Sequence, residues 1–141
     1  IYISTGTSTL KEIKEVMSDV NKEKFYLLHC VSSYPCEYKI ANLPRMKKLK
    51  EIGCRVGYSD HILGVESAKI AICEGAQVIE KHFTTDNDLP GRDNKFAILP
   101  KDMKDLSDFI KNRKLMLNKI SDDYQECEKD SRDNYTGRFD G

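Results

Sequence analysis

The sequence predicts an α/β fold in which parallel strands alternate with helices. Four short apolar segments alternate with segments whose apolar residues recur at the spacing of amphipathic helices. This alternation is typical of parallel strands joined by right-handed crossovers. Two architectures fit it, a small doubly wound sheet and half of an eight-stranded β/α barrel, which needs about 250 residues in full. The length of 141 residues by itself favours the doubly wound sheet.

The predicted strands are apolar runs that end at turn residues. They are Ile1–Thr5, Phe25–Cys30, Arg55–Tyr58 and Gln77–His82. The second is a continuous apolar run, which is typical of a strand covered on both faces. Gly6 follows the first strand, and Tyr34-Pro35 interrupts the chain after the second.

Four helices are predicted from apolar residues at helical spacing. Thr9 and Glu12 form a capping box at the start of the first. Gly75 stops the third, and Pro100 fits the first turn of the fourth. The apolar positions are Leu10, Ile13, Val16, Met17 and Val20 in the first helix, Leu43, Met46, Leu49 and Ile52 in the second, Ala68, Ile70, Ala71 and Ile72 in the third, and Met103, Leu106, Phe109, Ile110 and Leu117 in the fourth.

The polar segments set the predicted domain organisation. A loop from Thr84 to about Ile98 follows the fourth strand, and loops of this length in compact domains are functional or disordered. Residues 122–141 are mostly charged or polar, so no fold is assigned to them. We expect one domain over residues 1–120 and a polar linker or tail over residues 121–141.

Composition excludes several classes of partner. Twenty-three basic residues balance twenty-three acidic ones, so no net field attracts nucleic acid or an anionic membrane. No apolar run is long enough to span a membrane, and the first residues lack the charged-then-apolar pattern of a secretion signal, so a cytoplasmic domain is expected. The five cysteines include no C-x-x-C pair, which indicates reduced thiols. Because the chain begins at Ile1 with a strand, it is expected to be an excerpt of a longer protein.

All three histidines lie at the carboxyl end of a predicted strand, where parallel α/β folds build their sites. His61 and His82, from neighbouring strands, are candidate ligands of a divalent cation, with oxygen donors completing the coordination. The alternative is that each imidazole only satisfies a backbone carbonyl at the rim. His29 follows a wholly apolar run, so it is predicted to be a hydrogen-bonded core histidine.

Hydroxyl and carboxylate side chains recur at the same edge. Ser4, Ser32 and Ser59 could bind phosphate or carboxylate oxygens, although serine is also an ordinary turn residue. Asp93 could contact sugar hydroxyls or could belong to a solvated turn. Asp60, between Ser59 and His61, is predicted to fix the turn rather than to react.

Four motifs resemble, in order and spacing, those of the sialic acid synthases, which include the N-acetylneuraminate, legionaminic and pseudaminic acid synthases. The motifs are ISTG (Ile3–Gly6), LLHCVSSYP (Leu27–Pro35), VGYSDHILG (Val56–Gly64) and GAQVIEKHFT (Gly75–Thr84). Members of that family have a (β/α)₈ TIM barrel followed by a small antifreeze-like domain. The resemblance implies that this chain is the C-terminal half of the barrel, strands five to eight, and so favours the half barrel over the doubly wound sheet.

The resemblance also implies an activity and a set of site residues. The family condenses phosphoenolpyruvate with an N-acetylated hexosamine, such as N-acetylmannosamine, to give a nonulosonic acid and phosphate, which is a carbon–carbon bond-forming transfer. His61 and His82 match the catalytic histidines that bind its divalent metal, usually Mn²⁺. Phosphoenolpyruvate contacts are implied for Ser4, Ser32 and Ser59, and contacts to the amino-sugar substrate for Tyr34 and Asp93.

The sequence departs from the family pattern in ways that affect the expected activity. Arg92 and Asn94 stand where many relatives have proline and histidine, and Ala97 stands where serine is common, which leaves the acceptor sugar open. The family's residues from strands one to four are absent, so the isolated chain is expected to be inactive. It should form a homodimer or need the missing barrel half. The alternative is a non-catalytic half-barrel remnant that binds a metal or an anion or assembles with a partner chain.

Overall fold

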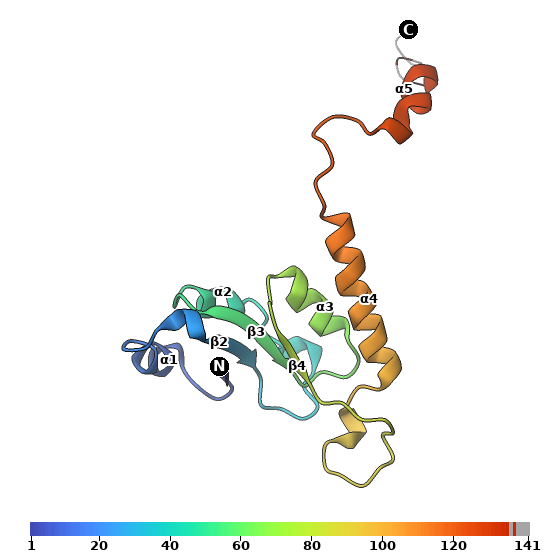
Figure 1. Cartoon of the computed structure of the whole chain (residues 1–141). Helices are drawn as coiled ribbons and strands as arrows, with labels where there is room; N and C mark the ends of the chain where they lie inside the picture. The colour runs from blue at the N-terminus through green and yellow to red at the C-terminus, as the bar shows by residue number, and fades with distance from the viewer. Residues whose placement is uncertain (136, 138–141) are drawn as a thin grey trace. The chain divides into compact units, whose positions relative to one another are not determined.

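The structure is a computed structural model that describes residues 1–135 and residue 137 (Figure 1). It contains one sheet whose strands all run parallel, in the order β1-β2-β3-β4. The strands are β1 (Tyr2–Ser4), β2 (Tyr26–Cys30), β3 (Arg55–Asp60) and β4 (Ile79–Lys81). Neighbours in the sequence are neighbours in the sheet, so the strand order never reverses as it does in a doubly wound sheet. The α/β class is confirmed, and the strand order is that of a half-barrel.

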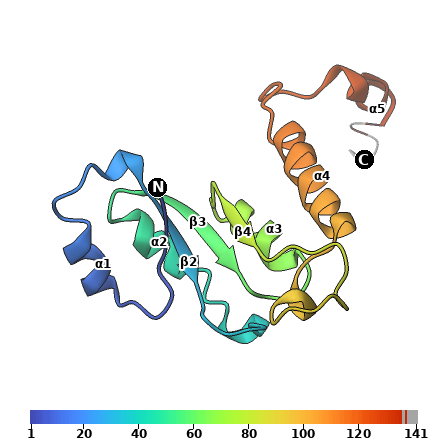
Figure 2. The same ribbon diagram turned by 60° about the horizontal axis from the view of Figure 1, so that its bottom comes forward.

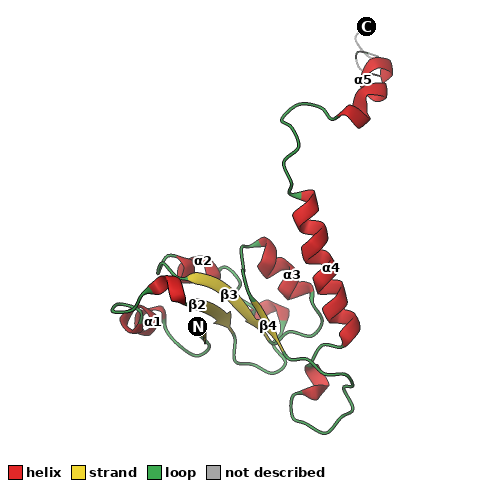
Figure 3. Cartoon of the chain, viewed as in Figure 1, coloured by secondary structure: helices red, strands yellow, loops and turns green. Residues whose placement is uncertain are grey.

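Helices follow the strands in the predicted alternation (Figures 2 and 3). They are α1 (Leu10–Val16), α2 (Arg45–Lys50), α3 (Glu66–Cys73), α4 (Pro100–Met116) and α5 (Lys129–Tyr135), with single 3₁₀ turns at Lys22–Lys24, Tyr38–Ile40, Asn94–Phe96 and Glu126–Glu128. The predicted capping box is confirmed, because Thr9 Oγ1 accepts from the Glu12 N–H and Glu12 Oε2 accepts from the Thr9 N–H. These bonds satisfy two amides that a helix start otherwise leaves unpaired.

The first helix ends earlier than predicted. Its apolar pattern continues to Val20, but the helix stops at Val16, whose side chain is exposed. Ser18 donates from both its N–H and its hydroxyl to the Glu15 carbonyl. Such local side-chain bonds compete with helix continuation.

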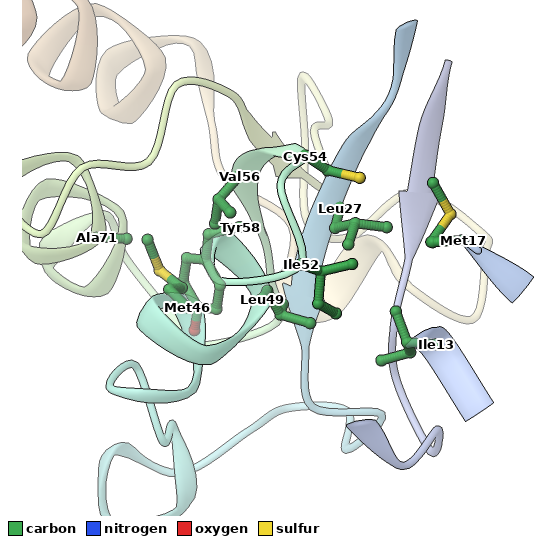
Figure 4. Packing of buried hydrophobic residues seen from close by; sticks show 10 residues of the cluster. All are labelled: Ile13, Met17, Leu27, Met46, Leu49, Ile52, Cys54, Val56, Tyr58 and Ala71. Carbon is green, nitrogen blue, oxygen red and sulfur yellow. The ribbon is translucent and has the colours of Figure 1, made fainter. Parts of the chain in front are cut away.

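The main core lies between the sheet and the helices (Figure 4). Its buried members are Ile13, Met17, Leu27, Met46, Leu49, Ile52, Cys54, Val56, Tyr58 and Ala71. A second cluster packs α3 against α4 and consists of Val65, Ala68, Ile72, Ile98 and Leu106. Because side chains alternate along a strand, the helix-facing positions Val56 and Tyr58 place Gly57 and Ser59 on the opposite face of β3. We call that opposite face the inner face.

The carboxyl ends of β3 and β4 differ from the sequence prediction. β3 extends to Asp60, two residues beyond the predicted Tyr58. β4 is shorter than Gln77–His82, because the His82 carbonyl accepts from the Ile98 N–H, in a segment beyond the sheet. β3 and β4 therefore both leave the sheet directly before a histidine, His61 and His82 respectively.

The chain divides into two compact units, Ile1–Lys111 and Asn112–Gly141. In the second unit, Lys129–Tyr135 forms a helix where the sequence predicted no fold. The Gln125 N–H bonds Glu128 Oε2 ahead of this helix, and Lys129 pairs with Asp133 one turn later. Local polar bonds of this kind support a short helix without a buried face. The domain boundary at residue 120 stays a prediction, and residues 136 and 138–141 lie outside the described part. Within the described residues, no helix is long and apolar enough to cross a membrane.

Candidate active site at the carboxyl ends of the strands

The candidate site is centred on His61, which directly follows β3. His61 is 8% exposed, and its Nδ1 lies 3.0 Å from the Val31 carbonyl oxygen. A bond to that oxygen requires the proton on Nδ1, which leaves the Nε2 lone pair available to a ligand. The contact with a rim carbonyl, which the sequence offered as the alternative, is therefore observed for His61. It uses only Nδ1, so Nε2 can still bind a ligand.

His82 follows β4 and stands next to His61. The two ring centroids are 5.4 Å apart, with an interplanar angle of 48°. Tyr34 and Phe96 complete an aromatic cluster around the pair. Tyr34 lies 4.2 Å from His61, and Phe96 lies 5.1 Å from His82, centroid to centroid. The four rings thus come from the three chain segments that follow β2, β3 and β4.

Two pockets meet at His82. The smaller, of ≈ 160 Å³, is lined by Ser59, His61, Glu80, Lys81 and His82. The larger, of ≈ 360 Å³, is lined by Tyr34, His82, Arg92, Asp93 and Phe96. The larger volume lies in the range of about 300–1,000 Å³ that is usual for small-molecule sites. Five of the seven predicted site residues therefore line these two pockets.

The polar loop after β4 brings Asp93 to this site. Asp93 Oδ2 lies 3.8 Å from His82 Nδ1. The side-chain amide of Asn87 donates to the carbonyls of Asn94 and Ala97, and that of Asn94 donates to those of Leu89 and Pro90. These amides replace backbone partners that an irregular loop lacks. The loop after β4, which the sequence predicts to be functional or disordered, is thus ordered by hydrogen bonds of its own asparagine side chains.

Ser59 is tied to a residue that the sequence argument did not single out. Its hydroxyl donates to Glu80 Oε1 over 2.7 Å, across the paired ends of β3 and β4. The alternation of β4 places Glu80 and His82 on the inner face, so this alternation was the available signal. Phe96 and Arg92 were also missed as site residues, because they come from a loop whose path has no periodic signal.

The two remaining predicted residues lie toward the other edge of the sheet. Ser4 ends β1, which pairs only with β2, and it is exposed. Ser32 follows β2, and its Oγ lies 3.9 Å from Cys30 Sγ. A Cβ placed on Gly6 would lie 2.3 Å from that Oγ, so the glycine allows the close approach. No contact joins Ser4 to the two histidines in the described part of the chain.

Two sequence predictions about neighbouring residues are confirmed. Asp60 is fully buried and holds the turn, because its Oδ1 accepts from the Ile62 N–H and its Oδ2 accepts from Ser67 and Lys81. His29 is a core histidine, since it is 1% exposed and its Nε2 lies 2.7 Å from the Ala41 carbonyl oxygen.

Two buried groups on the helix side of the sheet have shifted pKa values. Burial lowers the pKa of His29 below its usual value, and the Arg45 guanidinium lowers it further. Burial also raises the pKa of Tyr58, and the neighbouring Asp60 carboxylate adds to that shift. These groups therefore stay neutral on the helix side of the sheet.

The donor set at the inner face contains two imidazoles. Over residues 1–135 and 137, no group of three or more histidine, cysteine, aspartate or glutamate side chains is arranged to hold a metal ion. Metal–nitrogen bonds of imidazole are about 2.1 Å long, so two rings at the observed separation can reach one ion. Such an ion would need its other ligands from water or from bound oxygen groups.

The strands are parallel and follow one another in the sheet in sequence order, as in half of a β/α barrel. The two histidines lie at the carboxyl end of this sheet, where such barrels build their sites. The model of the NeuB family matches residues 1–122, and the chain belongs to that family. The predicted family is thereby confirmed.

Curated relatives of this chain include proteins named as N,N'-diacetyllegionaminic acid, N-acetylneuraminate-9-phosphate and pseudaminic acid synthases. The N,N'-diacetyllegionaminic acid synthase of Legionella pneumophila is 39% identical over 125 residues, which cover 83% of this chain and 35% of that protein. The N-acetylneuraminate-9-phosphate synthase of Drosophila melanogaster is 36% identical over 120 residues, which cover 82% of this chain and 32% of that protein. The chain thus spans about a third of these relatives' length.

Two solved structures are similar to this chain in fold as well as in sequence. The N-acetylneuraminic acid (sialic acid) synthetase of Leptospira borgpetersenii, crystallised in complex with citrate, superposes with a TM-score of 0.77 at 34% identity. The match covers 95% of this chain and 49% of that one. The spore coat polysaccharide biosynthesis protein SpsE of Bacillus subtilis superposes with a TM-score of 0.73 at 28% identity, over 86% of this chain and 37% of that one.

Proposed function

We propose that this chain is the metal-binding half of a synthase that condenses phosphoenolpyruvate with an N-acetylated hexosamine, giving a nonulosonic acid and phosphate. The observation that carries the proposal is the pair His61 and His82, with ring centroids 5.4 Å apart at adjacent strand ends. The names of the relatives agree with a synthase of this kind. In a complete barrel the four strands would be strands five to eight.

The two imidazoles fit a divalent cation that takes its remaining ligands from oxygen, as Mn²⁺ does. His61 would bind through Nε2, since its Nδ1 faces the Val31 carbonyl. The cation would supply Lewis-acid polarisation of the sugar aldehyde. Asp93 lies beside His82 and would hold that ring and the acceptor together. A single carboxylate can serve both because it has two oxygens.

The remaining site residues divide by position. Ser59, Ser32 and Ser4 lie along successive strand ends and would bind the phosphate and carboxylate of phosphoenolpyruvate, with Ser59 turning its hydroxyl from Glu80 to the substrate. Tyr34 and Asp93 line the ≈ 360 Å³ pocket and would bind the acceptor sugar. N-acetylmannosamine is one acceptor of the proposed class.

The chemistry proposed for the whole enzyme balances without an external oxidant or reductant. The methylene carbon of phosphoenolpyruvate attacks the aldehyde carbon, and the new carbon–carbon bond leaves the adjacent carbon cationic. The aldehyde oxygen becomes an alkoxide, which takes up the proton that water loses as it adds to the cationic carbon. The carbon–oxygen bond to phosphate then breaks, so that phosphate leaves with the electron pair and the new hydroxyl gives up its proton to form the ketone. Donors fixed at the strand ends would stabilise the negative charge of the substrate without reorganising during the reaction.

The activity test uses the 141-residue chain together with the region of the Legionella pneumophila relative that precedes the matched segment. The mixture receives phosphoenolpyruvate, N-acetylmannosamine and Mn²⁺, and released phosphate is measured. We expect release only when both parts and the metal are present. His82→Ala should abolish release, and His29→Gln, which alters a histidine that lines neither pocket, should retain it. Equal release by His82→Ala would overturn the proposed metal role. A mixture that associates but releases no phosphate would favour the non-catalytic remnant.

A further inference from the structure

A buried ion pair joins the ends of β3 and β4. Lys81 Nζ lies 2.9 Å from Asp60 Oδ2, and the two side chains are 3% and 0% exposed. Asp60 and Lys81 are register partners in the sheet, and both belong to the helix-facing side of it. In every other ion pair in the described part of the chain, at least one of the two partner side chains is exposed.

Stability alone is a weak explanation for such a pair. Removing two charges from water costs several kcal/mol per ion, and apolar residues of similar volume often stabilise a protein equally well or better. A buried pair does, however, define geometry, because leaving either charge without its partner is strongly unfavourable. Any shift between the two strand ends would separate Asp60 from Lys81 and incur that cost.

The position of the pair relates it to the two histidines. His61 is the residue after Asp60, and His82 is the residue after Lys81. Fixing Asp60 against Lys81 therefore fixes the starting points of both imidazole-bearing residues. The same groups also hold the chain that follows, since Lys81 Nζ donates to the Ile62 carbonyl over 2.6 Å and Asp60 accepts from the Ile62 N–H.

We infer that Asp60 and Lys81 are positioning residues that align His61 and His82 for one shared cation. This inference rests on the proposed metal role of the two histidines and deepens it. Ser67 of α3 donates to Asp60 over 2.7 Å and so links the pair to the helix layer. Lys81 lines the smaller pocket, but its ammonium is taken up by Asp60 and the Ile62 carbonyl, so the pair acts by holding two strand ends in register.

The experiment measures Mn²⁺ affinity of the full 141-residue chain by electron paramagnetic resonance, together with unfolding in urea. The variants are Asp60→Asn, Lys81→Met and the two combined. Each single change leaves one buried charge unpaired, so both stability and affinity should fall. The double variant removes both charges and should recover much of the stability. Its affinity should stay reduced about 10- to 100-fold, as for other residues that orient metal ligands.

Asp105→Asn is the matched control. It breaks a pair of similar chemistry, Lys69 Nζ to Asp105 Oδ2 at 2.6 Å, that is more exposed and lies away from the histidines. We expect it to leave Mn²⁺ affinity unchanged. A double variant that regains parental affinity along with its stability would show a purely structural pair and would overturn the inference.

A second readout separates this inference from the metal proposal. Nuclear Overhauser contacts between the ring protons of His61 and His82 report their alignment without any metal. We expect the contacts in the parent chain and their loss in the double variant. Contacts that persist in the double variant would overturn the inference even if the parent bound no Mn²⁺. A parent that shows the contacts and binds no Mn²⁺ would overturn the metal proposal alone.

Discussion

His29 and His61 are both buried histidines from neighbouring strands, and they face opposite sides of the sheet. His29 stacks on Tyr58 in the helix-side layer, with ring centroids 5.6 Å apart. His61 lines the inner-face pocket. The same residue type thus has a packing role on one face and offers a free ring nitrogen on the other, and the two roles can be separated by experiment.

The stability of the chain should fall as pH drops below about 6.5, the pKa of an unperturbed histidine. Burial holds the pKa of His29 below that value, so the unfolded state takes up a proton that the folded state does not. The stabilising contribution is complete above pH 6.5 and is lost as pH falls from there through the folded-state pKa. Urea unfolding between pH 7.5 and 5.5 tests this, with a slope of at most about 1.4 kcal/mol per pH unit from one group.

His29→Gln is the control for this pH dependence. It removes the titrating group, so the free energy of unfolding should vary less with pH over the same range. Unchanged pH dependence in this variant would assign the effect to other groups.

Gly57 should not tolerate a side chain. A Cβ there would lie 2.5 Å from Leu28 Cδ2 and 2.7 Å from the Val78 carbonyl oxygen, and the latter is backbone that cannot rotate away. Gly57→Ala should reduce the free energy of unfolding by about 1–3 kcal/mol, the usual range for overpacking. Thermal or urea unfolding measures this. Parental stability in the variant would mean that β3 and β4 can separate without cost.

The cysteines should divide into two reactivity classes. Cys73 and Cys127 are exposed, whereas Cys30, Cys36 and Cys54 are buried. Burial also raises the pKa of Cys36 and of Cys54, which lowers their thiolate fraction. A thiol-reactive disulfide should therefore label Cys73 and Cys127 rapidly and the buried three only after unfolding. Rapid labelling of Cys54 in the folded chain would contradict the packing of the main core.

The sequence predicts the parts of this fold that depend on local pattern. Apolar runs locate all four strands, and the capping box of Thr9 and Glu12 locates α1. The ends of elements were less accurate. The hydrogen bonds of Ser18 to the Glu15 carbonyl accompany the early end of α1. The His82 carbonyl accepts from the Ile98 N–H, which lies outside the sheet. Both effects come from individual polar contacts, which hydrophobic periodicity does not record.

Strand order and side-chain pairs were harder to predict. Length favoured a doubly wound sheet, and the half-barrel came only from the resemblance, because strand order is not encoded in any one segment. The proximity of His61 and His82 followed from strand ends that meet at one edge. The Asp60–Lys81 pair did not, since a lysine within a strand ordinarily indicates a solvent-facing position. Phe96 was missed because it comes from a loop.

Selective broadening by Mn²⁺ of histidine ring resonances tests the shared cation site most directly. Spectra of the 141-residue chain are recorded while Mn²⁺ is added at less than one equivalent, and His29 serves as the internal control. The ring signals of His61 and His82 should broaden together and first, while those of His29 broaden later. Broadening of only one of the two rings, or of His29 at the same concentration, would contradict a cation shared by His61 and His82.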